Sequence, residues 1–201
     1  MTDRPIVFIS STIRALLSDK KSQTRRLMWG EPHAAPQGVG GRPSVAFTLT
    51  DDLGRSARMY RTATIWEKVE VGDRLWVREA FAMRGPAVIL YRADHSASDA
   101  MVWRPSLHLP RARSRLTLVV TEVRRERVQQ ISRDDAIAEG VEWDMKSRRW
   151  HFDGRLADRQ DPRRVFEQFW RELHGDLEWE TDPEVIVLAF TVRHANIDTG
   201  E

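Results

Sequence analysis

The stretch Lys20-Lys21-Ser22-Gln23-Thr24-Arg25-Arg26 carries four cations and three hydroxyl or amide side chains, with no carboxylate among them. It follows a short apolar segment with helical spacing and precedes a loop rich in Pro and Gly. In a regular strand, residues two apart share a face, so one face would present a row of donors to an anion or a nucleobase. The alternative interpretation is a solvated, basic strand at the edge of a sheet.

The overall composition is that of one globular domain. The chain has 201 residues, of which 41% are hydrophobic and 31% are charged. It contains no cysteine, which excludes disulfides and thiolate metal sites, and its histidines show no metal-ligand spacing, so we expect neither metal nor cofactor. No apolar run approaches the ~18 residues of a membrane span and no signal-peptide pattern is present. We therefore expect a cytoplasmic protein without a membrane partner, monomeric by default.

The charge pattern says more about partners than the net charge does. The formal net charge is only +2, but arginine dominates the cations and is clustered, and eight tryptophans are present. Arginine forks bind phosphate and stack on bases, and aromatic rings stack on bases as well. This combination suits a nucleic acid or nucleotide partner, although tryptophan is first of all a core residue.

Hydrophobic periodicity predicts a mostly β domain with a few helices. The expected strands cover residues 6–9, 45–50, 56–64, 74–79, 88–91, 116–123 and 185–190, with a further hairpin within 143–155. The expected helices cover 12–18, the segment between the capping residue Ser132 and Gly140, and the segment between Asp161-Pro162 and Gly175. We expect a single domain over residues 1–201, with an inserted loop and hairpin at about 30–64.

Five short motifs occur in a characteristic order. They are Lys21-Ser22-Gln23-Thr24-Arg25-Arg26, Gly72-Asp73-Arg74-Leu75-Trp76-Val77-Arg78-Glu79, Tyr91-Arg92-Ala93-Asp94, Trp103-Arg104-Pro105-Ser106-Leu107-His108-Leu109-Pro110-Arg111 and Ala136-Ile137-Ala138-Glu139-Gly140. In this order the chain resembles the ASCH superfamily, specifically its phage- and prophage-associated branch, over roughly residues 6–192. The resemblance implies an α+β, PUA-like fold, a small and mostly antiparallel β-barrel with two to three packed helices. Such folds bind RNA or a nucleoside in a cleft.

The resemblance also implies an activity. Some ASCH proteins are amidohydrolases that deacylate N4-acetylcytidine, and their Lys, Thr and Glu motif falls on Lys21, Thr24 and Glu139 of this chain. Two alternatives stay open at this point. One is a non-catalytic RNA-binding module of phage or prophage origin. The other is an ASCH-type ribonuclease that uses Lys21 and an arginine to stabilise the phosphate.

Amide hydrolysis needs a nucleophile, a base and donors for the acyl oxygen. Lys21 could be the base and Thr24 the nucleophile, with Glu139 carrying the proton to the leaving amine. Alternatively, Glu139 could activate a water while Lys21 and Thr24 hold the acyl oxygen. In a regular strand Lys21 and Thr24 would lie on opposite faces, so a shared site predicts a turn, bulge or helix end between Ser22 and Gln23.

The remaining candidates are expected to bind substrate in the cleft. They are Arg26, Trp76, Arg78, Glu79, Trp103, Arg104, Ser106 and His108. The arginines could bind phosphate or a base edge, or could pair with Glu79 instead. The tryptophans could stack on bases or pack in the core. Ser106 and His108 could share a face, but no carboxylate near them in sequence orients His108.

Overall fold

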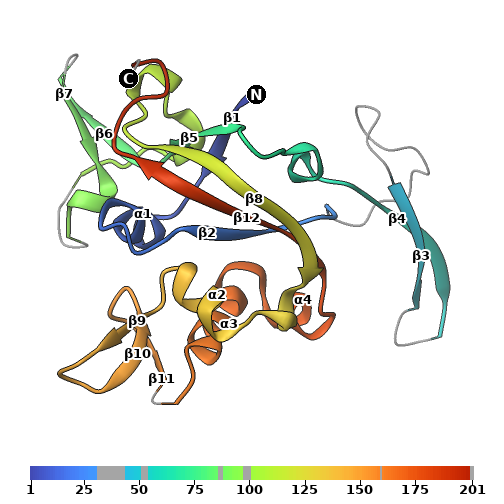
Figure 1. Ribbon diagram of the computed structural model, residues 1–201. Coiled ribbons are helices and arrows are strands. Elements are labelled where there is room, and N and C mark those ends of the chain that lie inside the picture. The colour runs from blue at the N-terminus through green and yellow to red at the C-terminus, as the bar shows by residue number, and fades with distance from the viewer. Residues whose placement is uncertain (31–43, 51–53, 86–87, 97–100, 159, 200–201) are drawn as a thin grey trace.

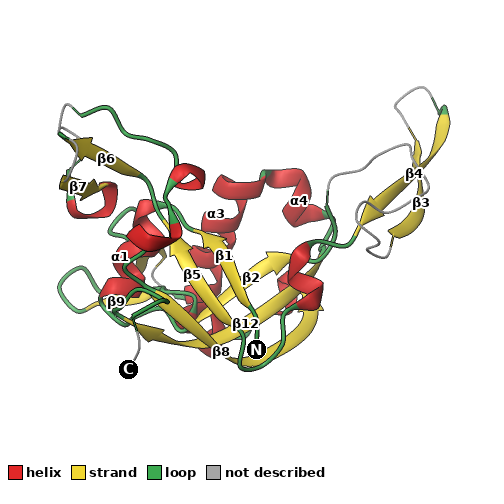
Figure 2. Ribbon diagram, turned by 90° about the horizontal axis from the view of Figure 1, so that it is seen from above, coloured by secondary structure: helices red, strands yellow, loops and turns green. Residues whose placement is uncertain are grey.

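The computed structural model describes residues 1–30, 44–50, 54–85, 88–96, 101–158 and 160–199. The protein is α+β, with mostly antiparallel sheets (Figures 1 and 2). The described α-helices number four rather than two or three: α1 (Ser10–Leu17), α2 (Arg133–Ala138), α3 (Pro162–His174) and α4 (Asp176–Glu180). None of the described helices has the length and apolar character needed to cross a membrane.

The central sheet has five strands in the order β1-β5-β8-β12-β2. Their bounds are β1 Asp3–Val7, β5 Arg74–Arg78, β8 Thr117–Arg127, β12 Glu184–Arg193 and β2 Gln23–Leu27. β1 and β5 are parallel, and the other neighbours are antiparallel. The expected closed barrel is not found among the described strands, because β1 and β2 remain the two edges of an open sheet. A side-chain hydrogen bond crosses the opening, since Arg26 Nη2 donates to the Val7 carbonyl at 2.8 Å.

Two hydrophobic clusters cover the two faces of this sheet. Leu75, Val77 and the inward residues of β8 pack with α1 in one cluster. Val185 and Val187 pack with α2, α3 and α4 in the other, and Figure 1 shows these three helices together on one side of the sheet. β12 contributes alternate residues to both clusters, which explains its unbroken apolar sequence.

Helix boundaries follow the sequence signals closely. The Ser132 hydroxyl accepts from the Asp135 N–H at 3.0 Å, and the Asp135 carboxylate accepts from the Ser132 N–H at 3.4 Å, so the predicted capping box forms. α3 starts at Pro162 behind Asp161 and stops at Gly175, which has φ +90°. α1 differs from expectation, because it begins at Ser10 behind Ile9 without a side-chain cap.

Smaller sheets project from this core. β3 (Ser44–Thr50) and β4 (Ser56–Thr62) form the predicted hairpin, which extends away from the body in both views (Figures 1 and 2). β6 (Phe81–Arg84) pairs with β7 (Val88–Tyr91), and β9 (Glu142–Asp144), β10 (Arg149–Phe152) and β11 (Leu156–Asp158) form a three-stranded sheet. Residues 31–43 of the expected inserted loop and residues 51–53 of its turn lie outside the described residues.

Candidate functional site

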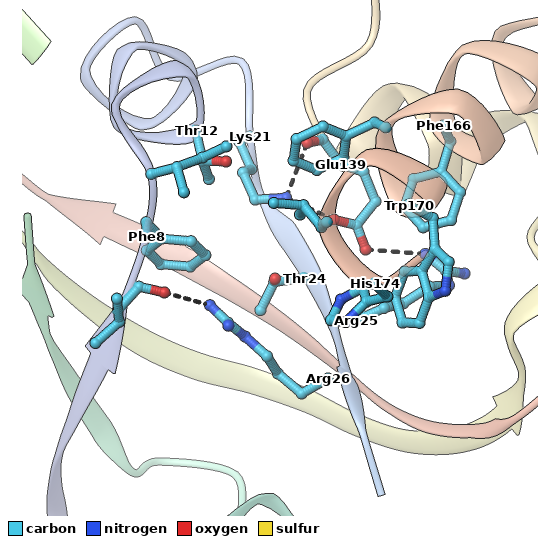
Figure 3. A pocket seen from close by; sticks show the side chains of 14 residues that line it. Phe8, Thr12, Lys21, Thr24, Arg25, Arg26, Glu139, Phe166, Trp170 and His174 are labelled. Carbon is cyan, nitrogen blue, oxygen red and sulfur yellow. Dashed lines mark hydrogen bonds and ion pairs between the residues drawn. The ribbon is translucent and has the colours of Figure 1, made fainter. Parts of the chain in front are cut away.

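A cavity of about 230 Å³ lies at the opening between the two edges of the central sheet. The end of β1 and the start of α1 form one wall, and β2 with the residues before it forms the floor. Glu139, just after α2, and the aromatic face of α3 complete it (Figure 3). The volume is below the ~300–1,000 Å³ of drug-sized ligand pockets, so the cavity can hold only a small ligand.

The regular strand geometry is absent at Lys21 and Ser22, where a site shared by Lys21 and Thr24 requires an irregular backbone. β2 begins only at Gln23, and Lys21 and Ser22 belong to an irregular segment after α1. This segment is pinned on both sides, because the Ser22 N–H donates to the Ala138 carbonyl and the Ser22 carbonyl accepts from the Phe190 N–H, both at 2.9 Å. As a result Lys21 and Thr24 line the same cavity, which confirms the predicted irregularity. The stretch is an edge strand, as the plain alternative has it, but Lys21, Thr24 and Arg25 are buried rather than solvated.

Glu139 connects two buried cations. Lys21 Nζ donates to Glu139 Oε2 at 2.5 Å and to the Glu139 carbonyl at 2.8 Å, while Arg25 Nη1 donates to Oε1 at 3.1 Å. The Lys21 and Glu139 residues are only 2% and 3% exposed. The next residue, Gly140, has φ +105°, a conformation that turns the chain sharply after α2. Glu139 directly follows the C-terminal end of α2, where the helix dipole disfavours a negative charge, and the two cations compensate for this position.

Burial controls the protonation of Lys21. It lowers the pKa of the Lys21 ammonium below its usual value, and the charges of Arg26 and Arg25 act in the same direction. Glu139 opposes this shift through charge and hydrogen bonding. Arg25 adds little free positive charge, because it also pairs with Glu126 and with Asp135. The site therefore holds a lysine that can give up its proton more readily than a solvated one.

Arg26 is a cation without a carboxylate partner among the described residues. Its Cζ lies 4.7 Å from the Phe8 ring centroid and 5.3 Å from that of Trp66, so the guanidinium is flanked by two aromatic rings. Its Nε is buried and has no acceptor in the described part of the chain. Burial lowers the pKa of Arg26 to about 10, with Glu139 acting against the shift. This fixed charge at the cavity wall can hold an oxygen of a ligand.

Two hydroxyl groups and an apolar wall complete the site. Thr24 and Thr12 both line the cavity, and within the described residues neither hydroxyl has a protein hydrogen-bond partner. Figure 3 shows the Thr24 hydroxyl on the side that faces Lys21 and Glu139. Phe166, Phe169 and Trp170 of α3 supply an aromatic wall opposite Phe8. The site thus combines a buried lysine, a hydroxyl and a carboxylate beside flat apolar surfaces.

The other sequence-predicted residues do not reach this cavity. None of its lining residues is Trp76, Arg78, Glu79, Trp103, Arg104, Ser106 or His108. Trp76 is buried with the Arg78 guanidinium 4.4 Å from its ring centroid. Glu79 binds neither Arg26 nor Arg78, because Arg115 donates to both of its oxygens at 2.8 and 2.9 Å.

The loop that carries Trp103 forms its own arrangement. The Trp103 and His95 ring centroids are 5.5 Å apart with the ring planes inclined at 48°, and Arg92 Cζ lies 5.0 Å from the Trp103 ring centroid. Arg104 pairs through its backbone with Phe81. Ser106 and His108 belong to a 3₁₀ turn, in which His108 is exposed. The alternating pattern and the composition indicated these polar and aromatic residues as candidates. These patterns do not show which face of a strand or loop lies against the cavity.

Several lining residues were not predicted. Arg25 lies in the opening stretch, but no sequence signal indicated that it would pair with Glu126 of β8 and with Asp135 and Glu139 at α2. Phe166, Phe169 and Trp170 of α3 belong to the hydrophobic core and also line the cavity. Their helical spacing is the only signal that could have indicated them. The sequence around Phe8 and Thr12 predicts a buried strand and the start of a helix, and it gives no indication that either residue lines a cavity.

Among the described residues, no group of three or more His, Asp or Glu side chains could hold a metal ion. No protein-family model matches the chain, and neither characterised proteins nor solved structures give a match. The geometry of the cavity and the resemblance of the motifs are therefore the basis for a function.

Proposed function

We propose that this protein is an ASCH-type amidohydrolase of PUA-like fold that removes the acyl group from N4-acetylcytidine-type nucleosides. The observation that carries the proposal is the 2.5 Å hydrogen bond from buried Lys21 Nζ to Glu139 Oε2, in a cavity that also contains the Thr24 hydroxyl. These three residues correspond to the Lys, Thr and Glu motif that the sequence resembles. The flat aromatic walls suit a pyrimidine ring.

The preferred mechanism uses Thr24 as the nucleophile. Neutral Lys21 takes the hydroxyl proton while Thr24 Oγ1 bonds to the acyl carbon, and the carbonyl becomes a tetrahedral oxyanion. Arg26 lines the cavity without a carboxylate partner among the described residues, so it is available to stabilise that oxyanion. Collapse breaks the bond from the acyl carbon to N4, and the nitrogen takes the proton from Lys21, with Glu139 as the relay. Water then hydrolyses the acyl-threonine and restores the hydroxyl.

A second role assignment uses the same residues differently. Glu139 would take a proton from a water that attacks the acyl carbon, and Lys21 with Thr24 would donate to the acyl oxygen. The two assignments differ in whether an acyl-threonine forms. They therefore predict different behaviour for a variant that lacks the Thr24 hydroxyl.

The first test is incubation with N4-acetylcytidine and chromatographic detection of cytidine. If Thr24 is the nucleophile, Thr24→Ala abolishes product, Thr24→Ser retains activity, and mass spectrometry of a quenched reaction detects one added acyl group. If Thr24 only donates to the acyl oxygen, Thr24→Ala costs about 10²–10³-fold in kcat. Thr12→Ala is the matched control, because it removes the same atoms from the same cavity and should have a smaller effect.

Failure of this test is equally informative. No cytidine at high enzyme concentration would exclude the amidohydrolase. Cleavage of a structured RNA in a parallel reaction would then favour the ribonuclease. Binding of RNA without any turnover would favour the non-catalytic module.

A further inference from the structure

A pair of tryptophans lies on the small sheet after α2, away from the cavity. Trp143 of β9 and Trp150 of β10 are directly opposite each other, and their ring centroids are 5.3 Å apart. Trp150 packs partly on the core, but Trp143 is 38% exposed. The Arg133 guanidinium lies 5.0 Å from the Trp150 ring centroid. An indole this exposed, beside a second indole and an arginine, is available to stack on a ligand.

Around this tryptophan pair, most carboxylates have a hydrogen-bond or ion-pair partner, whereas several cations have no ion pair within the described part of the chain. The carboxylates of the sheet are engaged: Glu142 pairs with Lys20, Asp153 pairs with Arg14, and Asp144 accepts the turn N–H groups of Lys146 and Ser147 at 2.9 and 3.1 Å. Four cations beside the pair have no ion pair among the residues the structure describes, namely Arg133, Lys146, Arg148 and Arg149. Two carboxylates oppose them without a cation partner among the described residues, the exposed Asp134 at the start of α2 and Asp144 of β9, and Arg133 also interacts electrostatically with Asp161. The balance leaves net positive charge around an aromatic surface.

We propose that this surface, formed by Trp143, Trp150, Arg133 and the turn cations Lys146 and Arg148, binds single-stranded nucleic acid. A base stacks on Trp143, and the cations contact the adjacent phosphates. A duplex does not offer the flat face of a base, so single strands are the preferred ligand. β9 starts shortly after Glu139, and Lys20, next to Lys21, holds Glu142. A single-stranded nucleic acid bound here would therefore lie on segments that are continuous in the chain with Glu139 and Lys21 of the cavity.

This surface goes beyond the proposed function, since it concerns binding and not hydrolysis. The test is fluorescence anisotropy with a labelled oligocytidine RNA of about ten nucleotides, the range that single-strand-binding folds cover. Trp143→Leu keeps an apolar side chain and removes the aromatic face, whereas Trp143→Phe keeps an aromatic face. Arg148→Gln removes one unpaired charge. Arg125→Gln is the matched control, because Arg125 is an exposed arginine of β8 that pairs with Glu67 at 3.0 Å.

The expected result is that Trp143→Leu weakens binding about 5- to 100-fold while Trp143→Phe retains most of the affinity. Arg148→Gln should lower the slope of log affinity against log salt by about 0.7, and Arg125→Gln should leave it unchanged. Equal loss in Trp143→Leu and Trp143→Phe, or equal effects of the two arginine variants, would overturn the proposal. Tighter binding of the same sequence as a duplex would also overturn it. Because binding is measured, the outcome is independent of whether Lys21 and Glu139 hydrolyse anything.

Discussion

At the scale of single residues, the cavity depends on one carboxylate. Glu139 accepts hydrogen bonds from Lys21 and Arg25. Burial lowers the pKa values of Lys21 and Arg26, and the negative charge of Glu139 acts against both shifts. Removing one partner of a buried ion pair leaves the other charge unpaired and typically costs about 3–5 kcal/mol. Glu139 therefore contributes to stability as well as to the proposed chemistry, and its variants must be tested for folding before their activity is interpreted.

The lowered pKa of Lys21 predicts the pH dependence of hydrolysis. A general base acts when it is neutral, so kcat/KM should rise as pH increases through the Lys21 pKa. Because burial lowers this pKa, the rise should be centred below the ~10.4 of an ordinary lysine. The measurement is kcat/KM for N4-acetylcytidine from pH 5 to pH 11, at intervals of about half a unit. A rise centred at about pH 10.4 or higher would contradict a buried lysine base.

At the scale of elements, the turn after α2 fixes Glu139 in place. A Cβ on Gly140 would lie 3.2 Å from the Ala15 Cβ and 3.2 Å from the Phe152 ring, in a backbone conformation that L-residues rarely adopt. Gly140→Ala should therefore destabilise the protein through strain of about 1–3 kcal/mol and overpacking of about 1–3 kcal/mol. Gly72→Ala is the control, because Gly72 has φ +88° with open space around it and incurs strain alone. Urea unfolding of both variants measures the difference, and equal losses would exclude the packing contribution.

The start of α2 should make stability depend on acidic pH. Hydrogen bonds and charge from Arg124, Ser132 and Arg25 overcome desolvation and lower the pKa of Asp135 to about 2. A carboxyl whose folded pKa is depressed stabilises the protein above its unfolded pKa of ~3.9 and loses that contribution as pH falls toward 2. We expect Asp135→Asn to cost about 1–2 kcal/mol at neutral pH, after allowance for partial exposure, and the deficit to shrink between about pH 4 and 2.

The adjacent residue supplies the control for this measurement. Asp134→Asn removes the same charge from an exposed side chain that has no ion pair among the described residues. Urea unfolding of both variants across the acidic range compares them directly. A pH-independent deficit in Asp135→Asn would show that only the capping hydrogen bonds matter.

At the scale of the whole molecule, the β3–β4 hairpin is attached through neighbouring points. Trp29 forms a bridge with Ala63, and the Gly30 N–H donates to the Thr62 carbonyl at 2.9 Å. Among the contacts described, Arg61 reaches Glu178 of α4 at 3.6 Å, a distance at which a surface ion pair contributes about 0–1 kcal/mol. Glu178→Ala should therefore lower the free energy of unfolding by only about 0–1 kcal/mol. A larger loss, measured by thermal unfolding monitored with circular dichroism, would show that this ion pair contributes more than an ordinary surface pair.

The sequence predicts most helices and strands correctly, but it predicts less well which of their residues come together in the folded protein. Local signals are sufficient for α3, for the capping box at Ser132 and for the β3–β4 hairpin. The irregular segment before Gln23 was predicted from the requirement that Lys21 and Thr24 share a site, and not from a local signal. Lys21, Thr24 and Glu139 come to one cavity, whereas the candidates on β5 and in the loop at 103–108 do not. Periodicity defines the two faces of a strand, but the neighbour on each face depends on long-range packing. The open sheet and the α3 wall are consequences of that packing, and no local pattern encodes them.

The open edge has a consequence for self-association. Two unpaired strand edges would ordinarily invite a strand from a second copy and lead to aggregation. β1 carries Pro5, which has no N–H to donate, and β2 carries Arg26, a cation without a carboxylate partner among the described residues, whose charge would repel an identical strand. The Arg26 side chain also occupies the Val7 carbonyl at the edge. The protein can therefore keep its sheet open for a ligand without offering the opening to another copy of itself.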